Sequence, residues 1–241
     1  MRKTILITGA SRGIGKKTAL VLAKEGHNIL INYNKSEKEA IELKEELISN
    51  GYSVEIFKAD ITNNEEIDKM IEFCLNKFGN IDVLINNAGI AQIKPFMDLS
   101  NLDWDNMINT NLTSIFYITK KVLQTMIKNK NGCIVNISSA WGIMGSSCEV
   151  HYSTAKAGII GFTKALAKEM GPSNIRVNCI APGAINTEMN DNITKEEMEK
   201  FREQIALRKI GEAIDIAKCI KWLVEDTYTT GQVIGIDGGL I

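Results

Sequence analysis

Short apolar runs alternate with helical segments along the whole chain, and this alternation constrains the fold more than any other feature. Each run is nearly continuous in Ile, Val and Leu, which is typical of strands buried on both faces of a parallel sheet. Seven strands are predicted, at residues 5–8, 28–33, 54–59, 83–86, 133–138, 176–180 and 233–236. Parallel strands joined through helices form right-handed crossovers. The sequence therefore predicts an α/β fold with a doubly wound sheet and helices on both faces.

Length and composition narrow the remaining choices. The 241 residues contain no linker, repeat or low-complexity tract, so residues 1–241 are predicted to form a single domain. The 28 basic and 29 acidic residues indicate neither nucleic acid nor an anionic membrane as partner. No apolar run approaches the about 20 residues that cross a bilayer. Five scattered cysteines indicate reduced thiols and a cytoplasmic location, and with two histidines no metal site is predicted.

Punctuation residues mark where elements begin and end. The capping-box pattern occurs at Ser36–Glu39, Thr62–Glu65 and Thr194–Glu197, and each predicts the start of a helix. Pro182-Gly183 is the clearest break, since the chain has only three prolines. The stretch from Ala184 to about Asn192 that follows is predicted to be a mobile lid.

A glycine-rich turn, Thr8-Gly9-Ala10-Ser11-Arg12-Gly13-Ile14-Gly15, follows the first predicted strand and opens a helix. Gly9 allows a tight turn, Gly13 removes a Cβ where phosphate must approach, and Gly15 lets helix and strand pack closely. The free N–H groups at the helix N-terminus would then face a pyrophosphate. Glycines also make plain turns, but the strand–turn–helix context favours a dinucleotide cofactor in a Rossmann-type fold of about seven parallel strands.

The end of the second predicted strand distinguishes NADP from NAD. NAD is held by an acid that accepts from the ribose 2′-OH, but this end reads Ile31-Asn32-Tyr33-Asn34-Lys35-Ser36, without an acid. Asn, Lys and Ser would accept a 2′-phosphate, and Arg12 offers a second cation, so NADP(H) is predicted. As single charges Arg12 and Lys35 would fit a solvated surface equally well, and the missing acid is the stronger argument. Asp60 would accept from the adenine amino group, or cap a helix near Thr62.

Tyr152-Ser153-Thr154-Ala155-Lys156 places a Tyr and a Lys four residues apart, with Ser139 thirteen residues upstream. On a helix, side chains at this spacing project from the same face. A free phenol has a pKa of roughly 10, and a nearby ammonium lowers the pKa of the phenol toward the working range. The Ser139 hydroxyl would hold a substrate oxygen. Alone, this pair is also an ordinary feature of amphipathic helices, so the other motifs decide.

Together these motifs resemble the classical short-chain dehydrogenase/reductase family, and the resemblance covers essentially the whole chain. The matching pieces, in family order, are Thr8–Gly15, Asn86-Asn87-Ala88-Gly89, Asn111, Ser139, Tyr152, Lys156 and Pro182-Gly183. The resemblance implies an NADP-dependent oxidoreductase acting on CH–OH groups. In such an enzyme hydride is transferred to a substrate carbonyl, with Tyr152 as the general acid.

The same resemblance implies a role for each matching residue. Lys156 would lower the pKa of Tyr152 and bind the nicotinamide ribose, and Ser139, rather than Ser138, would polarise the carbonyl. Asn111 would hold a water that joins Lys156 to solvent, or would cap or bend its helix. The residues expected to contact the cofactor are Gly9, Ser11, Arg12, Gly13, Ile14, Gly15, Asn32, Asn34, Lys35, Ser36, Asp60, Ile61, Asn87, Ala88, Gly89, Tyr152, Lys156, Pro182, Gly183, Ile185 and Thr187.

Two branches of the family are similar to this chain. Bacterial 3-oxoacyl-(acyl-carrier-protein) reductases of fatty acid biosynthesis carry basic residues near the cleft mouth; Lys130 matches one position, and Ser173-Asn174 depart from the other. The segment Ser139–Tyr152 resembles reductases of the 5-aminopentanone-modified lysine of elongation factor P. Glu149 would meet the ammonium of that substrate, or simply favour a helix N-terminus. Trp141 would wall the pocket or belong to the core. The leading substrate is a 3-oxoacyl thioester, with the modified protein lysine as alternative.

Assembly and a contrasting function complete the predictions. Gly158, Gly161 and Ala165 form a stripe of small residues that lets another helix approach closely. That helix would belong to the same chain or to a second copy, and in the resembling family such helices pair across a two-fold axis, which predicts a homotetramer or homodimer. A non-catalytic dinucleotide-binding sensor would be expected to lose at least one catalytic residue. This chain contains all four, which are Asn111, Ser139, Tyr152 and Lys156.

Overall fold

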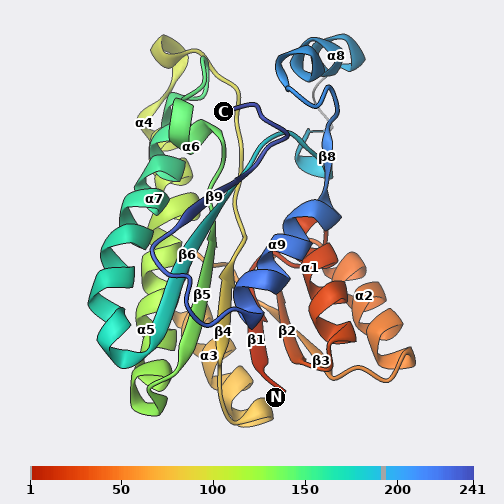
Figure 1. The fold of residues 1–241 in the computed structure, drawn as a ribbon, viewed down its shortest axis with the longest axis vertical. Helices are drawn as coiled ribbons and strands as arrows, with labels where there is room; N and C mark the ends of the chain where they lie inside the picture. The colour runs from red at the N-terminus through yellow and green to blue at the C-terminus, as the bar shows by residue number, and fades with distance from the viewer. Residues whose placement is uncertain (1, 191–193) are drawn as a thin grey trace.

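Seven parallel strands form the centre of the molecule in a computed structural model that describes residues 2–190 and 194–241 (Figure 1). Their order across the sheet is β3-β2-β1-β4-β5-β6-β9. The strands are β1 (Thr4–Ile7), β2 (Asn28–Tyr33), β3 (Val54–Lys58), β4 (Val83–Asn86), β5 (Gly132–Ile137), β6 (Ile175–Pro182) and β9 (Val233–Ile236). The predicted Rossmann-type α/β sheet is confirmed, and each predicted strand end lies within two residues of the observed one.

Helices cover both faces of the sheet (Figure 1). One layer contains α1 (Gly13–Lys24), α2 (Glu37–Ser49) and α9 (Ala213–Glu225), and the other contains α3 (Asn64–Phe78), α5 (Ser114–Asn129) and α7 (Val150–Met170). Strand side chains alternate between the two layers: Ile5 and Ile7 pack toward α1, whereas Leu6 packs toward α3 and α5. Because both faces are buried, the strands show no polar alternation in the sequence.

Shorter elements lie between the main strands and helices. They are η1 (Phe96–Asp98), α4 (Asn101–Ile108), the short π-helix η2 (Asn109–Thr113), α6 (Trp141–Met144), η3 (Gly171–Ser173), β7 (Ile185–Asn186), η4 (Glu188–Asn190), α8 (Lys195–Gln204) and β8 (Gly211–Glu212). In Figure 1, α8 projects beyond the end of the sheet. The predicted lid contains β7 and η4, and its residues 191 and 192 lie outside the described residues.

All three capping-box patterns lie at helix starts, but only one of them forms the capping box itself. Thr194 does form a capping box with Glu197, through bonds of 3.3 and 2.9 Å. Ser36 makes no side-chain cap bond. The cap of α3 is Asn63, whose Oδ1 accepts from two backbone N–H groups of the first turn. The reason is that the Thr62 hydroxyl donates to Asp60 at 2.7 Å instead.

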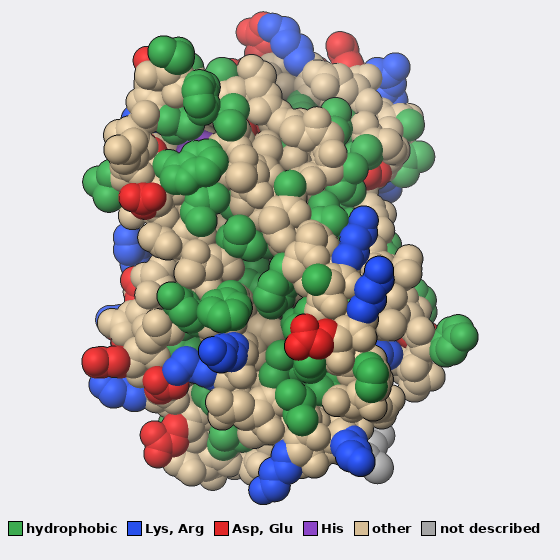
Figure 2. All heavy atoms as spheres, turned by 90° about the vertical axis from the view of Figure 1, so that its left-hand side faces the viewer, with side chains coloured by type: hydrophobic (Ala, Val, Ile, Leu, Met, Phe, Trp, Pro, Cys, Tyr) green, Lys and Arg blue, Asp and Glu red, His purple; other side chains and the backbone are tan. Residues whose placement is uncertain are grey.

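One face carries apolar side chains that remain exposed. Figure 2 views the side of the molecule that holds α4 and α7, where hydrophobic side chains form a broken band between charged ones. Phe116 and Ile127 of α5 and Leu102 of α4 are among the exposed large hydrophobic residues.

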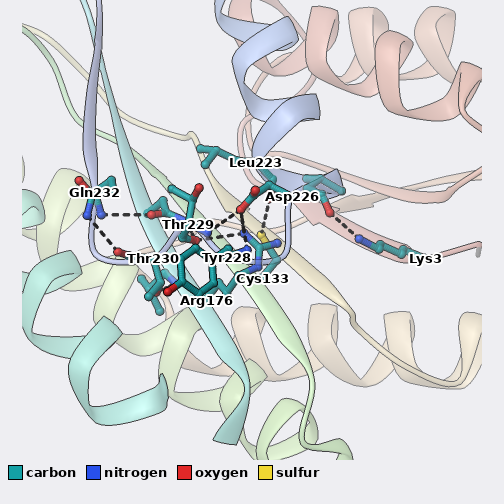
Figure 3. Close-up of polar contacts among 12 residues, drawn as sticks. Lys3, Cys133, Arg176, Leu223, Asp226, Tyr228, Thr229, Thr230 and Gln232 are labelled. Atoms are coloured by element: carbon teal, nitrogen blue, oxygen red, sulfur yellow. Dashed lines mark hydrogen bonds and ion pairs between the residues drawn. The ribbon is translucent and has the colours of Figure 1, made fainter. Parts of the chain in front are cut away.

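The connection from α9 to β9 is fixed by a polar cluster (Figure 3). Asp226 accepts from the backbone N–H groups of Tyr228 and Thr229, at 3.0 and 2.6 Å. Arg176 of β6 pairs with Asp226 at 3.8 Å and donates to the Thr229 carbonyl at 3.3 Å. These bonds direct the chain into β9 beside β6, so that the two strands end together at the carboxyl edge of the sheet.

The cysteines agree with the prediction of reduced thiols, because all five are free. Cys74, Cys133 and Cys179 are buried. Among the described residues, no helix combines the length and the apolar character required to cross a bilayer.

Candidate active site

The turn between β1 and α1 depends on glycine for steric reasons. Gly9 and Gly13 have left-handed backbones, with φ of 61° and 54°. A Cβ on Gly9 would lie 2.8 Å from Ala88 Cα, and a Cβ on Gly15 would lie 2.5 Å from the Gly9 carbonyl oxygen. The turn is therefore closed tightly against the segment after β4. The N-terminus of α1 faces the carboxyl edge of the sheet, and its first turn contains no acidic residue.

Buried amides hold this turn in place. Asn32 Oδ1 accepts from Gly9 N at 3.2 Å, and Asn32 Nδ2 donates to the Ala59 carbonyl at 3.0 Å. Asn87 Nδ2 donates to the carbonyls of Thr8 and Gly9, at 3.0 and 2.9 Å. Asn32 and Asn87, both predicted to contact a cofactor, thus have amide groups engaged with the backbone of the turn. Their side chains fix the conformation of the turn.

Asn34, Lys35, Ser36 and Asp60 gather where β2 and β3 end. Burial raises the pKa of Asp60, but bonds from Thr62, a bond from Asn34 and the charge of Lys35 outweigh it and lower the pKa. The Asp60 carboxylate therefore offsets part of the positive charge of Lys35. Asp60 follows β3, so the sequence at the end of β2 does not contain this acid.

The other residues predicted around the cofactor differ in exposure. Arg12 is exposed at the N-cap of α1, and Ser11 is buried. Ile14 packs against the core beneath the turn. Ile61 is buried in the core beside α3, so only its backbone is accessible to a cofactor.

Tyr152 and Lys156 lie together on α7. Lys156 Nζ is 5.5 Å from the centre of the Tyr152 ring. Both residues are buried: Lys156 is 4% exposed and Tyr152 is 8% exposed. Ser139, just after β5, is close enough to Tyr152 to lower the pKa of the phenol, and its Oγ accepts from Trp141 N at 3.1 Å. Ser138 instead donates to the Lys156 carbonyl at 2.8 Å. Neighbouring side chains therefore point in different directions, and Ser139 is the one that meets Tyr152.

Burial controls the ionisation of this pair. It raises the pKa of Tyr152 to about 12, against a smaller lowering by Ser139, and the charge of Glu149 raises the pKa further. Burial also lowers the pKa of Lys156 to about 8. The net pKa of Tyr152 is therefore raised because desolvation dominates, and the lowering of this pKa by Lys156 stays a prediction. At neutral pH the phenol is protonated and is a hydrogen donor.

Asn111 lies in the short π-helix η2, where the chain passes from α4 into α5. Its Oδ1 accepts from Ile90 N and its Nδ2 donates to the Ile90 carbonyl, both at 2.9 Å. A Cβ on Gly89 would lie 2.6 Å from Asn111 Oδ1 and 3.6 Å from Lys156 Nζ. Asn111 and Gly89 thus lie beside Lys156. The role of Asn111 in holding a water that joins Lys156 to solvent stays a prediction.

Glu149 and Trp141 lie near Tyr152 in the segment before α7. Ser146 Oγ donates to Glu149 Oε1 at 3.3 Å, and Glu149 is close enough to Tyr152 to raise the pKa of the phenol. Burial raises the pKa of Glu149 more than Ser146 and Trp141 lower it. Phe201 of α8 packs edge-on against Trp141, with ring centres 5.5 Å apart. No motif in the sequence marks Phe201, which the fold brings to the site.

The end of β6 connects the catalytic residues to the glycine turn. Pro182 O accepts from Ala140 N at 2.8 Å, and Gly183 N donates to Ile236 O at 3.0 Å. Ile185 is buried in the core. The Thr187 methyl lies 3.5 Å from where a Cβ on Gly13 would be. Residues 182–187 therefore run from the segment after Ser139 to the glycine turn.

Comparison with known proteins decides the family, because residues 3–198 match the family model described as short chain dehydrogenase. The chain belongs to the short-chain dehydrogenase family. The 3-oxoacyl-(acyl-carrier-protein) reductase of Synechocystis sp. is 42% identical over 98% of this chain and 96% of its own length. Proteins of the same name are similar at 38% in Staphylococcus epidermidis (100% of this chain, 99% of theirs) and at 39% in Buchnera aphidicola (99% and 97%).

Lys130 of this short-chain dehydrogenase does not lie near its own cleft. Lys130 and Asn174 immediately precede β5 and β6, and Asn174 Nδ2 donates to the Lys130 carbonyl at 3.3 Å. They therefore occupy the amino edge of the sheet, whereas Ser139 follows β5 at the carboxyl edge. The prediction that Lys130 stands at the cleft mouth is wrong within one chain, because the whole length of β5 separates the two edges.

Proposed function

We propose that this short-chain dehydrogenase is an NADPH-dependent ketoreductase in which Tyr152 is the general acid. The supporting observation is the cluster of buried Tyr152 and Lys156 with half-buried Ser139, which lies beside Gly89 at the carboxyl edge of the sheet. A phenol, a hydroxyl and an ammonium in this arrangement suit the proton and charge changes of carbonyl reduction. A dinucleotide sensor without catalysis would gain nothing from burying a lysine whose pKa is thereby lowered.

The mechanism assigns one task to each residue. A bound NADPH would supply the hydride for the carbonyl carbon. Ser139 donates a hydrogen bond to the carbonyl oxygen and stabilises the charge that develops there. Tyr152 gives its O–H proton to the same oxygen. The Lys156 ammonium, 5.5 Å from the ring centre, then stabilises the phenolate by charge attraction until solvent reprotonates it.

The residues present fit a dinucleotide. The positions of Gly9 and Gly15 exclude a Cβ, and the α1 N-terminus offers free N–H groups, as a pyrophosphate cradle requires. Arg12, Lys35, Asn34 and Ser36 would hold a 2′-phosphate, with Asp60 reducing their net charge. Gly183, Ile185 and Thr187 would border the nicotinamide, and Ala88 and Gly89 the adenosine and its ribose.

The substrate class that we propose is a 3-oxoacyl thioester on an acyl carrier. The support comes from the curated relatives, which carry that activity in their names and match this chain almost end to end. Trp141 would wall the acyl pocket. Since Lys130 lies at the opposite edge of the sheet, a carrier docked at one cleft would meet this residue only on a second copy of the chain.

The alternative substrate is the 5-aminopentanone-modified lysine of elongation factor P. One observation favours it: the carboxyl group of Glu149 is close enough to Tyr152 to raise the pKa of the phenol. A carboxylate there would attract an ammonium-bearing ketone, whereas an uncharged acyl chain would gain nothing from it.

A substrate comparison tests the proposal. Turnover with NADPH is measured on acetoacetyl thioester and on a peptide that carries the aminopentanone-modified lysine. Faster reduction of the thioester supports the first assignment, and faster reduction of the peptide supports the second. No reduction of either would contradict the ketoreductase. In parallel, NADPH should bind more tightly than NADH; tighter NADH binding would contradict the assignment of Arg12 and Lys35.

We also propose that the chain forms a homodimer or homotetramer through the face shown in Figure 2. Open space lies beside Gly161, whereas a Cβ on Gly158 would meet Leu112 of the same chain at 2.7 Å. The stripe of small residues is thus used partly within the chain and partly left open. Light scattering should give two or four times the mass of one chain, and a monomeric mass would contradict the assembly.

A further inference from the structure

His151 is buried beside Tyr152 in a contact that the proposed chemistry leaves unexplained. It lies in the first turn of α7 and is 0% exposed. Its Nε2 is 3.1 Å from Gln92 Oε1. Gln92 belongs to the segment of residues 90–94, which follows β4 and Gly89. The contact therefore joins α7 to this segment.

The partners of Gln92 determine which nitrogen of His151 carries the proton. Gln92 Nε2 lies 3.1 Å from Asp103 Oδ1, and a carboxylate only accepts, so the amide N–H must face Asp103. Gln92 Oε1 then faces His151 and needs a donor. The imidazole is thus the neutral tautomer with its proton on Nε2. Its Nδ1 is buried and has no hydrogen-bond partner among the described residues.

The contact continues into a larger network. Asp103 accepts from Lys94 Nζ at 2.7 Å, and it also forms the capping box of α4 with Ser100. The backbone N–H of Lys94 donates to the Cys148 carbonyl at 2.7 Å. The segment 90–94 is therefore fastened to α4, to the loop before α7 and to α7 itself.

This segment borders the reacting groups. Ile90 holds both amide atoms of Asn111, and Gly89 packs beside Asn111 and Lys156. Ile93 is 68% exposed, although its neighbours on the chain are held in the network. Movement of the segment would therefore displace Gly89 and Asn111 relative to Lys156.

We propose that His151 is a positioning residue, which holds the segment 90–94 beside Lys156 and Tyr152 only while its imidazole is neutral. Protonation would place an N–H and a positive charge at buried Nδ1, for which the described part of the chain offers no acceptor, and such a group is strongly unfavourable. The imidazole must then leave the site and release Gln92. This role rests on the proposed function and identifies the group that controls its loss at acidic pH.

The charges around His151 agree with this behaviour. Asp103 on α4 raises the pKa of His151 and Lys94 of the segment lowers it, while burial is the largest effect and brings the pKa below its ordinary 6.5. On α7 itself, Glu149 and Tyr152 flank it in sequence, and Tyr152 is neutral in this range. The imidazole is therefore neutral at pH 7 and gains its proton below pH 6.5. Activity should accordingly be lost as the pH falls.

The test compares pH profiles of kcat/KM for NADPH-dependent reduction of acetoacetyl thioester. Wild type should lose about tenfold per pH unit once His151 is protonated. His151→Leu should lower kcat/KM at every pH, because Gln92 Oε1 loses its donor. His151→Gln, which keeps a donor but cannot ionise, should restore most of that loss at pH 7.5 and lack the acidic decline.

His27→Gln is the matched control, because His27 is the only other histidine and burial also lowers its pKa. His27 accepts from Lys3 N at 3.2 Å, close to the start of β1 and β2, and its variant should keep the acidic decline. An unchanged decline in His151→Gln would overturn the positioning role and leave the proposed function intact. A wild type without NADPH turnover at any pH would instead remove the proposed function.

Hydrogen exchange supplies a readout that needs neither variant nor turnover. In wild type, protection of the Lys94 amide, which donates to Cys148, should fall below pH 6.5 faster than that of the α3 amides. Constant relative protection from pH 7.5 to pH 5 would contradict the release of the segment, whatever the activity does.

Discussion

The glycine turn and the catalytic cluster both depend on buried polar groups, but they use these groups differently. In the turn, the amides of Asn32 and Asn87 bond to backbone groups of neighbouring strands and loops. In the cluster, burial displaces the pKa of Tyr152 to about 12 and that of Lys156 to about 8. The turn is thus a frame whose bonds are satisfied. The cluster keeps ionisable groups away from their ordinary pKa values, as reaction sites do.

The largest effect on the glycine turn is expected from Gly9→Ala. Its left-handed backbone and the 2.8 Å approach to Ala88 both oppose a side chain, and we expect a loss of about 3 kcal/mol or more in the free energy of unfolding, with loss of NADPH binding. Gly51→Ala is the control, because φ is 81° there but nothing lies within 4 Å. It should cost only about 1–2 kcal/mol. Equal losses in urea titrations would mean that close packing of the turn is unimportant.

The catalytic cluster should make both the free energy of unfolding and the turnover depend on pH. Unfolded lysine holds its proton to about pH 10.4, whereas Lys156 releases it at about 8. Between these values the unfolded state binds more protons, so the free energy of unfolding should rise with pH, by about 3 kcal/mol relative to Lys156→Met. Turnover should fall over the same window, as the ammonium is lost. Parallel stability profiles for the two proteins would show that Lys156 is not strongly desolvated.

Removing one amide of the frame should have a smaller effect. Asn87→Ala leaves the carbonyls of Thr8 and Gly9 without their donor, and we expect a loss of about 1–3 kcal/mol together with weaker NADPH binding. Asn50→Ala removes an exposed bond to the Glu46 carbonyl and serves as control, with a smaller loss and unchanged binding. If both variants bind NADPH like wild type, Asn87 does not shape the cofactor cradle.

The features that the sequence predicts well are those that depend on local periodicity. The sheet follows from strands buried on both faces, and the four-residue spacing of Tyr152 and Lys156 places them on one side of α7. The pKa of Tyr152 was not predictable in this way, because it depends on how deeply the fold buries the phenol. The contact of Phe201 with Trp141 joins elements far apart in the chain. Lys130 was misplaced because a motif match does not tell at which edge of the sheet a residue lies.

Turnover of Tyr152→Phe tests the central claim most directly. Wild type and variant are compared in NADPH-dependent reduction of acetoacetyl thioester, with the dissociation constant for NADPH measured for both. Loss of the only proton donor proposed for the carbonyl oxygen should lower kcat about a thousandfold, while NADPH affinity stays within about twofold, because the glycine turn is untouched. A variant that keeps more than about a tenth of wild-type turnover would show that another group supplies the proton.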